Sequence, residues 1–120
     1  MSKRVKDPAV YLWDMLYEID WIAASLHRKE QIYDSILGRA LLRSFTVLGE
    51  AAKRVDDATK IRSSHIPWQK VIDTRNFLSH EYENVNLERI WDIVDGHLPQ
   101  LKTDLLLLYK ELTGTDYHAD

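Results

Sequence analysis

The chain has 120 residues, of which 45% are hydrophobic and 29% charged, and its formal net charge is −3 at pH 7. This length and composition are typical of one globular domain, so we expect residues 1–120 to form a single domain. The lack of cysteine excludes a disulfide scaffold and thiolate-bound zinc, and it fits a reducing cytoplasm, which is the location we predict. No apolar run approaches the roughly 20 residues that span a bilayer, so no membrane partner is expected. Because the chain is acidic, any nucleic-acid site must be a local basic one.

The first half of the chain predicts two long helices. Asp7 followed by Pro8 is a helix cap followed by a proline suited to the first helical turn. Apolar residues then recur at spacings of three and four, which predicts a buried stripe formed by Leu12, Met15, Leu16, Ile19, Ile22, Ala23 and Leu26. A second helix is predicted from about Gln31 to Val55, with its core face at Ile36, Leu37, Ala40, Leu41, Leu48, Ala51, Ala52 and Val55.

The second half predicts two more helices after a connector at residues 56–65, which has room for one short helical turn. Ile66 and Pro67 start the third helix, with Trp68, Val71, Ile72 and Leu78 as its apolar positions. "ENVN" at 83–86 breaks it, and the last stripe contains Leu87, Ile90, Trp91, Val94, Leu98, Leu101, Leu105 and Leu108. Pro99 marks either a kink in that stripe or the first turn of a fifth helix. The sequence therefore predicts an all-α antiparallel bundle of four main helices.

Most catalytic patterns find no match in this sequence. The five histidines show no HExxH spacing, so we predict no metal site and no cofactor. No serine has the strand–turn–helix setting of a nucleophile elbow. The leucine run 105–108 is too short to span a membrane. It suggests an apolar patch that a partner helix covers in a homodimer, or else part of the monomer's own core.

The stretch "TRNFLSHEY" at 74–82 is the candidate site. A guanidinium, here Arg75, binds a phosphate through two parallel hydrogen bonds, and the imidazole of His80 moves a proton near neutral pH. On a continuous helix Asn76 and His80 share one face, and Arg75 and Tyr82 share another. Arg75 and His80 diverge by about 140°, so the arginine must reach round or the helix must end near Ser79. Spacing alone leaves open that these are ordinary exposed residues of a helix end.

Four segments in order resemble the HepT-like branch of the HEPN superfamily. "RNFLSHEY" matches its Arg-x4-His-x-Tyr motif, and "VLGEAAKRV" at 47–55 resembles a segment of its second helix. "IPWQKVIDTRN" resembles the lead into its motif helix, and "NLERIWDIVDGHLPQL" resembles its closing helices. The likeness covers roughly residues 12–112. It implies a HEPN-type helical homodimer that acts as a metal-independent endoribonuclease, the toxin of a bacterial toxin–antitoxin pair.

The same resemblance implies roles for particular residues and partners. Arg75 and His80 inherit the catalytic roles, and Asn76 inherits a supporting one. RNA is the implied substrate, and the implied antitoxin is a minimal nucleotidyltransferase of the MntA-like type that silences the toxin by transferring AMP to Tyr82. Two other classes stay open: a catalytically idle helical module that docks a nucleotidyltransferase or nucleotide, and a purely structural dimer. An intact pair of Arg75 and His80 disfavours both, because neither requires the histidine.

A basic strip on the second predicted helix offers a local nucleic-acid surface. By the three-and-four rule, one face holds Arg39, Arg43, Thr46, Glu50 and Lys53. If this strip lines the cleft of the dimer, it offsets the acidic net charge locally, and Arg39, Arg43 and Glu50 become supporting residues. The alternative is an ordinary solvated face in which Glu50 pairs with a neighbouring cation.

Overall fold

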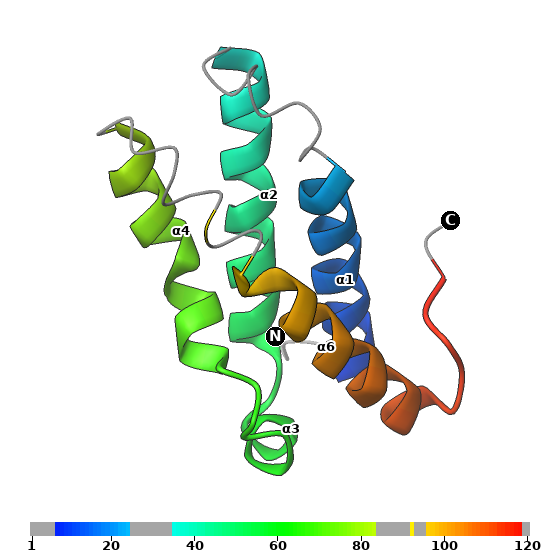
Figure 1. Cartoon of the computed structure of the whole chain (residues 1–120). Helices are drawn as coiled ribbons and strands as arrows, with labels where there is room; N and C mark the ends of the chain where they lie inside the picture. Colours follow the sequence, from blue (N-terminus) through cyan, green and yellow to red (C-terminus); the bar gives the residue numbers. More distant parts are fainter. Residues whose placement is uncertain (1–6, 25–34, 84–91, 93–95, 119–120) are drawn as a thin grey trace, which may run out of the picture.

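The computed structural model describes residues 7–24, 35–83, 92 and 96–118, and every regular element in this part of the chain is a helix. The elements are α1 (Pro8–Ala24), α2 (Ser35–Arg54), α3 (Asp57–Arg62), α4 (Trp68–Glu83) and α6 (Leu98–Thr113). Helix α2 lies between α1 and α4, α6 crosses over α1 and α2, and α3 closes one end (Figure 1). The all-helical prediction is confirmed for these residues. None of the described helices is both long and apolar enough to cross a bilayer.

The helix boundaries agree with most of the predicted signals. The Asp7 carboxylate accepts a hydrogen bond of 2.9 Å from the backbone N–H of Ala9, as expected of a cap. Pro99 stands in the first turn of α6, so the fifth-helix alternative is correct and the kink is not. The short helical turn in the connector is α3. The predicted start of the second helix at 31–34, the break at 84–86 and the stripe at 87–91 lie outside the described residues.

Helix α3 joins α2 to α4 through a compact set of hydrogen bonds. Asp56 caps it by accepting from the backbone N–H of Thr59 at 3.2 Å and from its hydroxyl at 2.6 Å. The hydroxyl bond lowers the pKa of Asp56 below its ordinary value of 3.8. Ser63 donates to the Thr59 carbonyl at 2.6 Å, and the buried Trp68 indole donates to the Ser63 carbonyl at 3.2 Å. This chain of bonds fixes the direction in which α4 leaves the turn.

The core follows the predicted stripes with a few corrections. Buried apolar residues come from all four longer helices, with Leu12, Met15, Leu16, Ile19, Ile22, Leu41, Leu48, Val71, Leu101 and Leu105 among them. Ala23 was predicted inside but is exposed, because it lies in the last turn of α1. Phe45 was not predicted, yet it is 1% exposed and among the largest fully buried side chains.

The leucine run of α6 belongs mainly to the bundle's own core. Leu105 and Leu108 are buried and Leu106 is partly buried against them, whereas Leu107 is 66% exposed. The prediction of a four-leucine patch for a partner helix is therefore wrong, because a helical run of four turns its side chains to different sides. The homodimer itself is a separate prediction that this burial does not decide.

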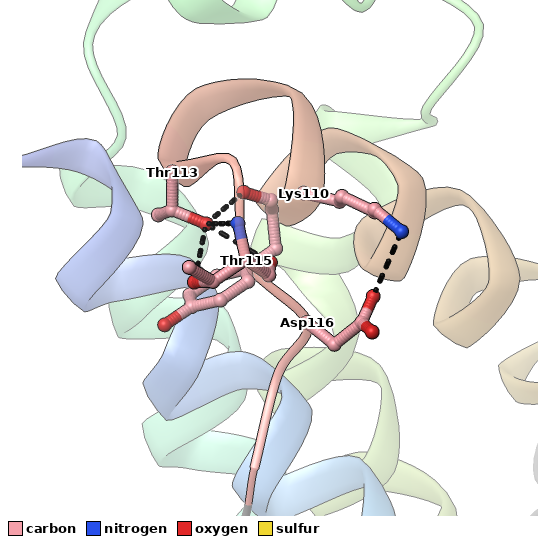
Figure 2. Close-up of polar contacts among 5 residues, drawn as sticks. Lys110, Thr113, Thr115 and Asp116 are labelled. Carbon is pink, nitrogen blue, oxygen red and sulfur yellow. Dashed lines mark hydrogen bonds and ion pairs between the residues drawn. The ribbon is translucent and has the colours of Figure 1, made fainter.

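The end of α6 turns the chain back toward α1. Gly114 adopts a left-handed conformation with φ of 75°, and its N–H bonds to the Lys110 carbonyl at 2.7 Å. Figure 2 shows the next contacts: the Thr115 N–H donates to the Thr113 hydroxyl at 3.2 Å, and Lys110 pairs with Asp116 at 3.3 Å. From there the tail runs alongside α1 (Figure 1).

Gly49 of α2 lies against the backbone of α4. A Cβ atom at this position would lie 3.1 Å from the carbonyl oxygen of Ile72 and 3.4 Å from that of Val71. These contacts with backbone atoms are tight, so a side chain here would require α4 to move by a few tenths of an ångström or more. The two helices run antiparallel (Figure 1), so this contact sets which residues of α2 lie level with which residues of α4.

We expect Gly49→Val to destabilise the fold by about 1–3 kcal/mol, because its branched side chain would push α4 away from α2. The measurement is thermal and denaturant unfolding followed by circular dichroism. The matched control is Gly96→Val, since a Cβ there would meet nothing within 4 Å. A Gly49→Val protein as stable as the control would show that the approach of the two helices is not tight.

Candidate functional site on α4 and α2

Helix α4 carries the whole predicted motif. It extends from Trp68 to Glu83, so the backbone of residues 74–82 is helical. The alternative in which the helix ends near Ser79 is therefore wrong. Asn76 is exposed on this helix. The side chains of Arg75, His80 and Tyr82 lie outside the described part of the structure, and their roles stay predictions.

Because α4 is unbroken, the motif positions fall on two different faces of the helix. Positions four residues apart fall on one face, as do positions seven apart, which groups 76 with 80 and 75 with 82. Positions 75 and 80 are separated by about 140° around the axis. Within one chain, the helix backbone thus presents the arginine and histidine positions on different faces.

The strip on α2 is exposed, as predicted. Arg39, Arg43, Glu50 and Lys53 are all exposed, while Thr46 is half-buried and donates its hydroxyl to the Leu42 carbonyl at 2.8 Å. Among the described residues no ion pair joins Glu50 to a cation of the strip.

The contact at Gly49 relates the level of the strip to the level of the motif. Counting ten residues toward the start of α2 from Gly49 reaches Arg39, and ten toward the end of α4 from Ile72 reaches Tyr82. Both helices rise about 1.5 Å per residue, so these two positions lie at the same level along the antiparallel pair. Arg43 lies level with Leu78 by the same count. Arg39 and Arg43 therefore lie at the levels of the motif half of α4.

Lys60 adds a cation that periodicity could not have revealed. It belongs to α3, but its ammonium donates to the Lys53 carbonyl at 3.3 Å, at the far end of the strip. No spacing rule links these two residues, because the turn between α2 and α3 brings them together. The only sequence signal was the concentration of Lys and Arg in residues 53–62.

A separate cavity of about 370 Å³ lies between the first turns of α4 and α6. Its lining is mainly apolar, and it consists of Leu48, Pro67, Lys70, Val71, Asp73, Thr74, His97, Leu98 and Leu101. An apolar hollow does not suit a phosphate backbone, which requires donors and positive charge. We therefore place the candidate chemistry on the exposed surface of α4 and α2.

The described residues contain no group of three or more His, Asp or Glu side chains able to hold a metal ion. His65 and His97 are both exposed.

The comparisons with known proteins all indicate the same family. The profile described as "Ribonuclease HepT-like" matches residues 14–106. A protein of Caldanaerobacter subterraneus subsp. tengcongensis named "Putative RNase" is 30% identical over 89% of this chain and 99% of its own length. One of Methanocaldococcus jannaschii with the same kind of name is 26% identical over 99% of both chains. The "Probable ribonuclease HepT" of Thermococcus cleftensis is 32% identical over 52% of this chain and 57% of its own. No solved structure gives a significant match.

The helical architecture and these matches define the class as a ribonuclease, with RNA as its substrate. Within that class, the chain belongs to the HepT-like family, whose profile covers well over half of its length.

Proposed function

We propose that this protein is a metal-independent endoribonuclease that acts as the toxin of a bacterial toxin–antitoxin pair. The observation that carries the proposal is that the exposed Arg39 and Arg43 of α2 lie at the levels of the half of α4 that holds the Arg-x4-His-x-Tyr motif. RNA cleavage needs a catalytic motif and a phosphate-binding surface, and we assign these two roles to α4 and α2.

The proposed reaction uses the substrate's own 2′-hydroxyl as the nucleophile. His80 removes the proton from that hydroxyl, and its oxygen attacks the adjacent phosphorus. The bond to the 5′-oxygen breaks, that oxygen takes up a proton, and the products are a 2′,3′-cyclic phosphate and a free 5′-hydroxyl. Arg75 stabilises the charge that builds on the phosphoryl oxygens through two parallel hydrogen bonds. No step draws on a metal ion.

A homodimer supplies the second proton group. One imidazole cannot remove a proton and deliver another in the same step, whereas a two-fold axis presents two copies of His80 across one cleft. The continuous helix supports the same arrangement, because positions 75 and 80 diverge by about 140° within one chain. We infer a composite site in which both copies contribute motif residues.

The strip on α2 serves to hold the RNA backbone near the motif. Arg39 and Arg43 neutralise phosphates, Asn76 contributes a hydrogen-bonding amide, and Glu50 limits how far the positive surface extends. Control is proposed to act at Tyr82, where a nucleotidyltransferase antitoxin adds AMP. The added phosphodiester carries a negative charge and a bulky nucleoside, so it opposes an incoming RNA strand by both charge and volume.

The strip can be tested by the salt dependence of binding to a single-stranded RNA. Each lost phosphate contact reduces the slope of log K against log salt by about 0.7, so Arg39→Ala with Arg43→Ala should reduce it by about 1.4. Lys102→Ala with Lys110→Ala removes the same charge from α6, where both lysines pair with carboxylates. Equal effects of the two double variants would mean that only the net charge matters.

Cleavage is tested with a chelator present. His80→Ala should lower the rate by about 10²–10⁴-fold, the usual contribution of a general acid or base. Arg75→Ala should abolish cleavage, and Arg75→Lys should restore little of it because an ammonium cannot make the two parallel bonds. His65→Ala is the control, since His65 is an exposed histidine outside the motif. A folded His80→Ala protein with full activity would exclude this mechanism, whereas a folded wild type that cleaves no RNA would favour an idle docking module.

Control at Tyr82 is tested by coexpression with the cognate minimal nucleotidyltransferase. The wild type should gain the mass of AMP and lose cleavage, whereas Tyr82→Phe should stay unmodified and active because it keeps the ring but has no acceptor oxygen. Tyr17→Phe is the control, because it removes an exposed tyrosine hydroxyl on α1. If Tyr82→Phe is silenced to the same extent as the wild type, the antitoxin acts by forming a complex with the toxin or by modifying another residue.

A further inference from the structure

The outer face of α1 combines exposed apolar side chains with carboxylates. Val10, Tyr17 and Trp21 are 42%, 42% and 38% exposed, and together they make up most of the large hydrophobic side chains that the described residues expose. Spacings of seven and four place them on one side of the helix, with Asp14 between them and Glu18 beside them. We call these five residues the α1 outer face.

One ring of this face, that of Tyr17, is held in place by its contact with Trp13. Trp13 stacks on Tyr17 with centroids 5.3 Å apart and an interplanar angle of 15°. Tyr117 of the returning tail packs against Trp13 at 5.9 Å, and the Trp13 indole donates to the His118 carbonyl at 3.0 Å. Aromatic rings fixed in this way lose little conformational entropy on binding, which is typical of anchor positions in interfaces.

The charge on this face has one sign. Helix α1 contains three carboxylates and no lysine, arginine or histidine. Asp20 is paired with Lys102 at 2.6 Å, whereas among the described residues no cation pairs with Asp14 or Glu18. Both of these carboxylates are half-buried beside the exposed rings. A bound partner therefore has to supply positive charge as well as apolar surface.

We propose that the α1 outer face is a docking surface for a basic amphipathic helix of a partner protein. Lysine or arginine side chains of that helix pair with Asp14 and Glu18 and lie over the rings of Tyr17 and Trp21, where cations are attracted to the aromatic face. Aliphatic side chains of the same helix cover Val10. The face spans the twelve residues from Val10 to Trp21, a rise of about 16 Å, which matches about three turns of a partner helix.

The same charges argue against other occupants. A two-fold contact between copies of this chain would bring Asp14 and Glu18 of one copy toward those of the other, which like charges oppose. RNA and anionic lipid surfaces carry phosphates and are repelled for the same reason. Helix α1 lies across α2 from α4 (Figure 1), so a partner bound to α1 leaves the motif helix uncovered.

The test uses isothermal titration calorimetry of the full chain with a synthetic leucine–lysine peptide of about 18 residues, which forms about five turns of an amphipathic helix. We expect binding that weakens as salt is raised. Asp14→Asn with Glu18→Gln should weaken it by about tenfold, and Trp21→Ser by at least as much, because anchors of this kind dominate an interface. Leu107→Ser is the matched control, since it removes an exposed leucine from α6, and it should bind like the wild type.

Several results would overturn the proposal. A peptide with glutamate in place of lysine that binds equally well would show that charge plays no part. Equal binding by Asp14→Asn with Glu18→Gln, in a protein whose fold is verified by circular dichroism, would show that these two carboxylates do not contact the peptide. If Trp21→Ser changes the oligomeric state in sedimentation, the face is instead a contact between copies of this chain.

Discussion

The arrangement of the candidate site depends on the absence of a side chain at Gly49. A Cβ there would come within 3.1 Å of the Ile72 carbonyl, so a larger residue would require α2 and α4 to shift apart. The contact relates the levels of the two antiparallel helices. By this register Arg39 and Arg43 of α2 lie at the levels of the motif of α4. The bonds from Asp56 to Thr59 and from Trp68 to Ser63 fix the turn that feeds α4 into this contact.

The continuity of α4 is the geometric reason for proposing that two copies of the chain share one site. A straight helix cannot turn two positions five residues apart onto one face, since its period is 3.6 residues. A break near Ser79 would have permitted a site within one chain, but the helix continues to Glu83. Composite sites across a two-fold axis solve this geometric problem with one sequence, because each residue appears twice.

The net charge of −3 is distributed unevenly over the bundle. Helix α1 holds carboxylates without any basic residue, whereas α2 and α3 expose cations along one strip. In our proposals this uneven charge directs an anionic substrate to α2 and a cationic partner to α1. An acidic chain can therefore belong to a family that acts on RNA, because binding depends on local potential rather than on the total.

The sequence by itself determined the helices, most of the buried stripes and the motif, because the three-and-four spacing of apolar residues and the signals at helix ends are local. It also placed Arg39, Arg43, Glu50 and Lys53 on one exposed face. Only the tertiary structure decided that Pro99 starts α6, that Leu105 and Leu108 enter the core while Leu107 does not, and that Phe45 is buried. The sequence also could not predict which residues of α2 lie level with which residues of α4, or that Lys60 bonds to the Lys53 carbonyl. These features depend on which helices become neighbours, and residues far apart in the chain meet only after packing.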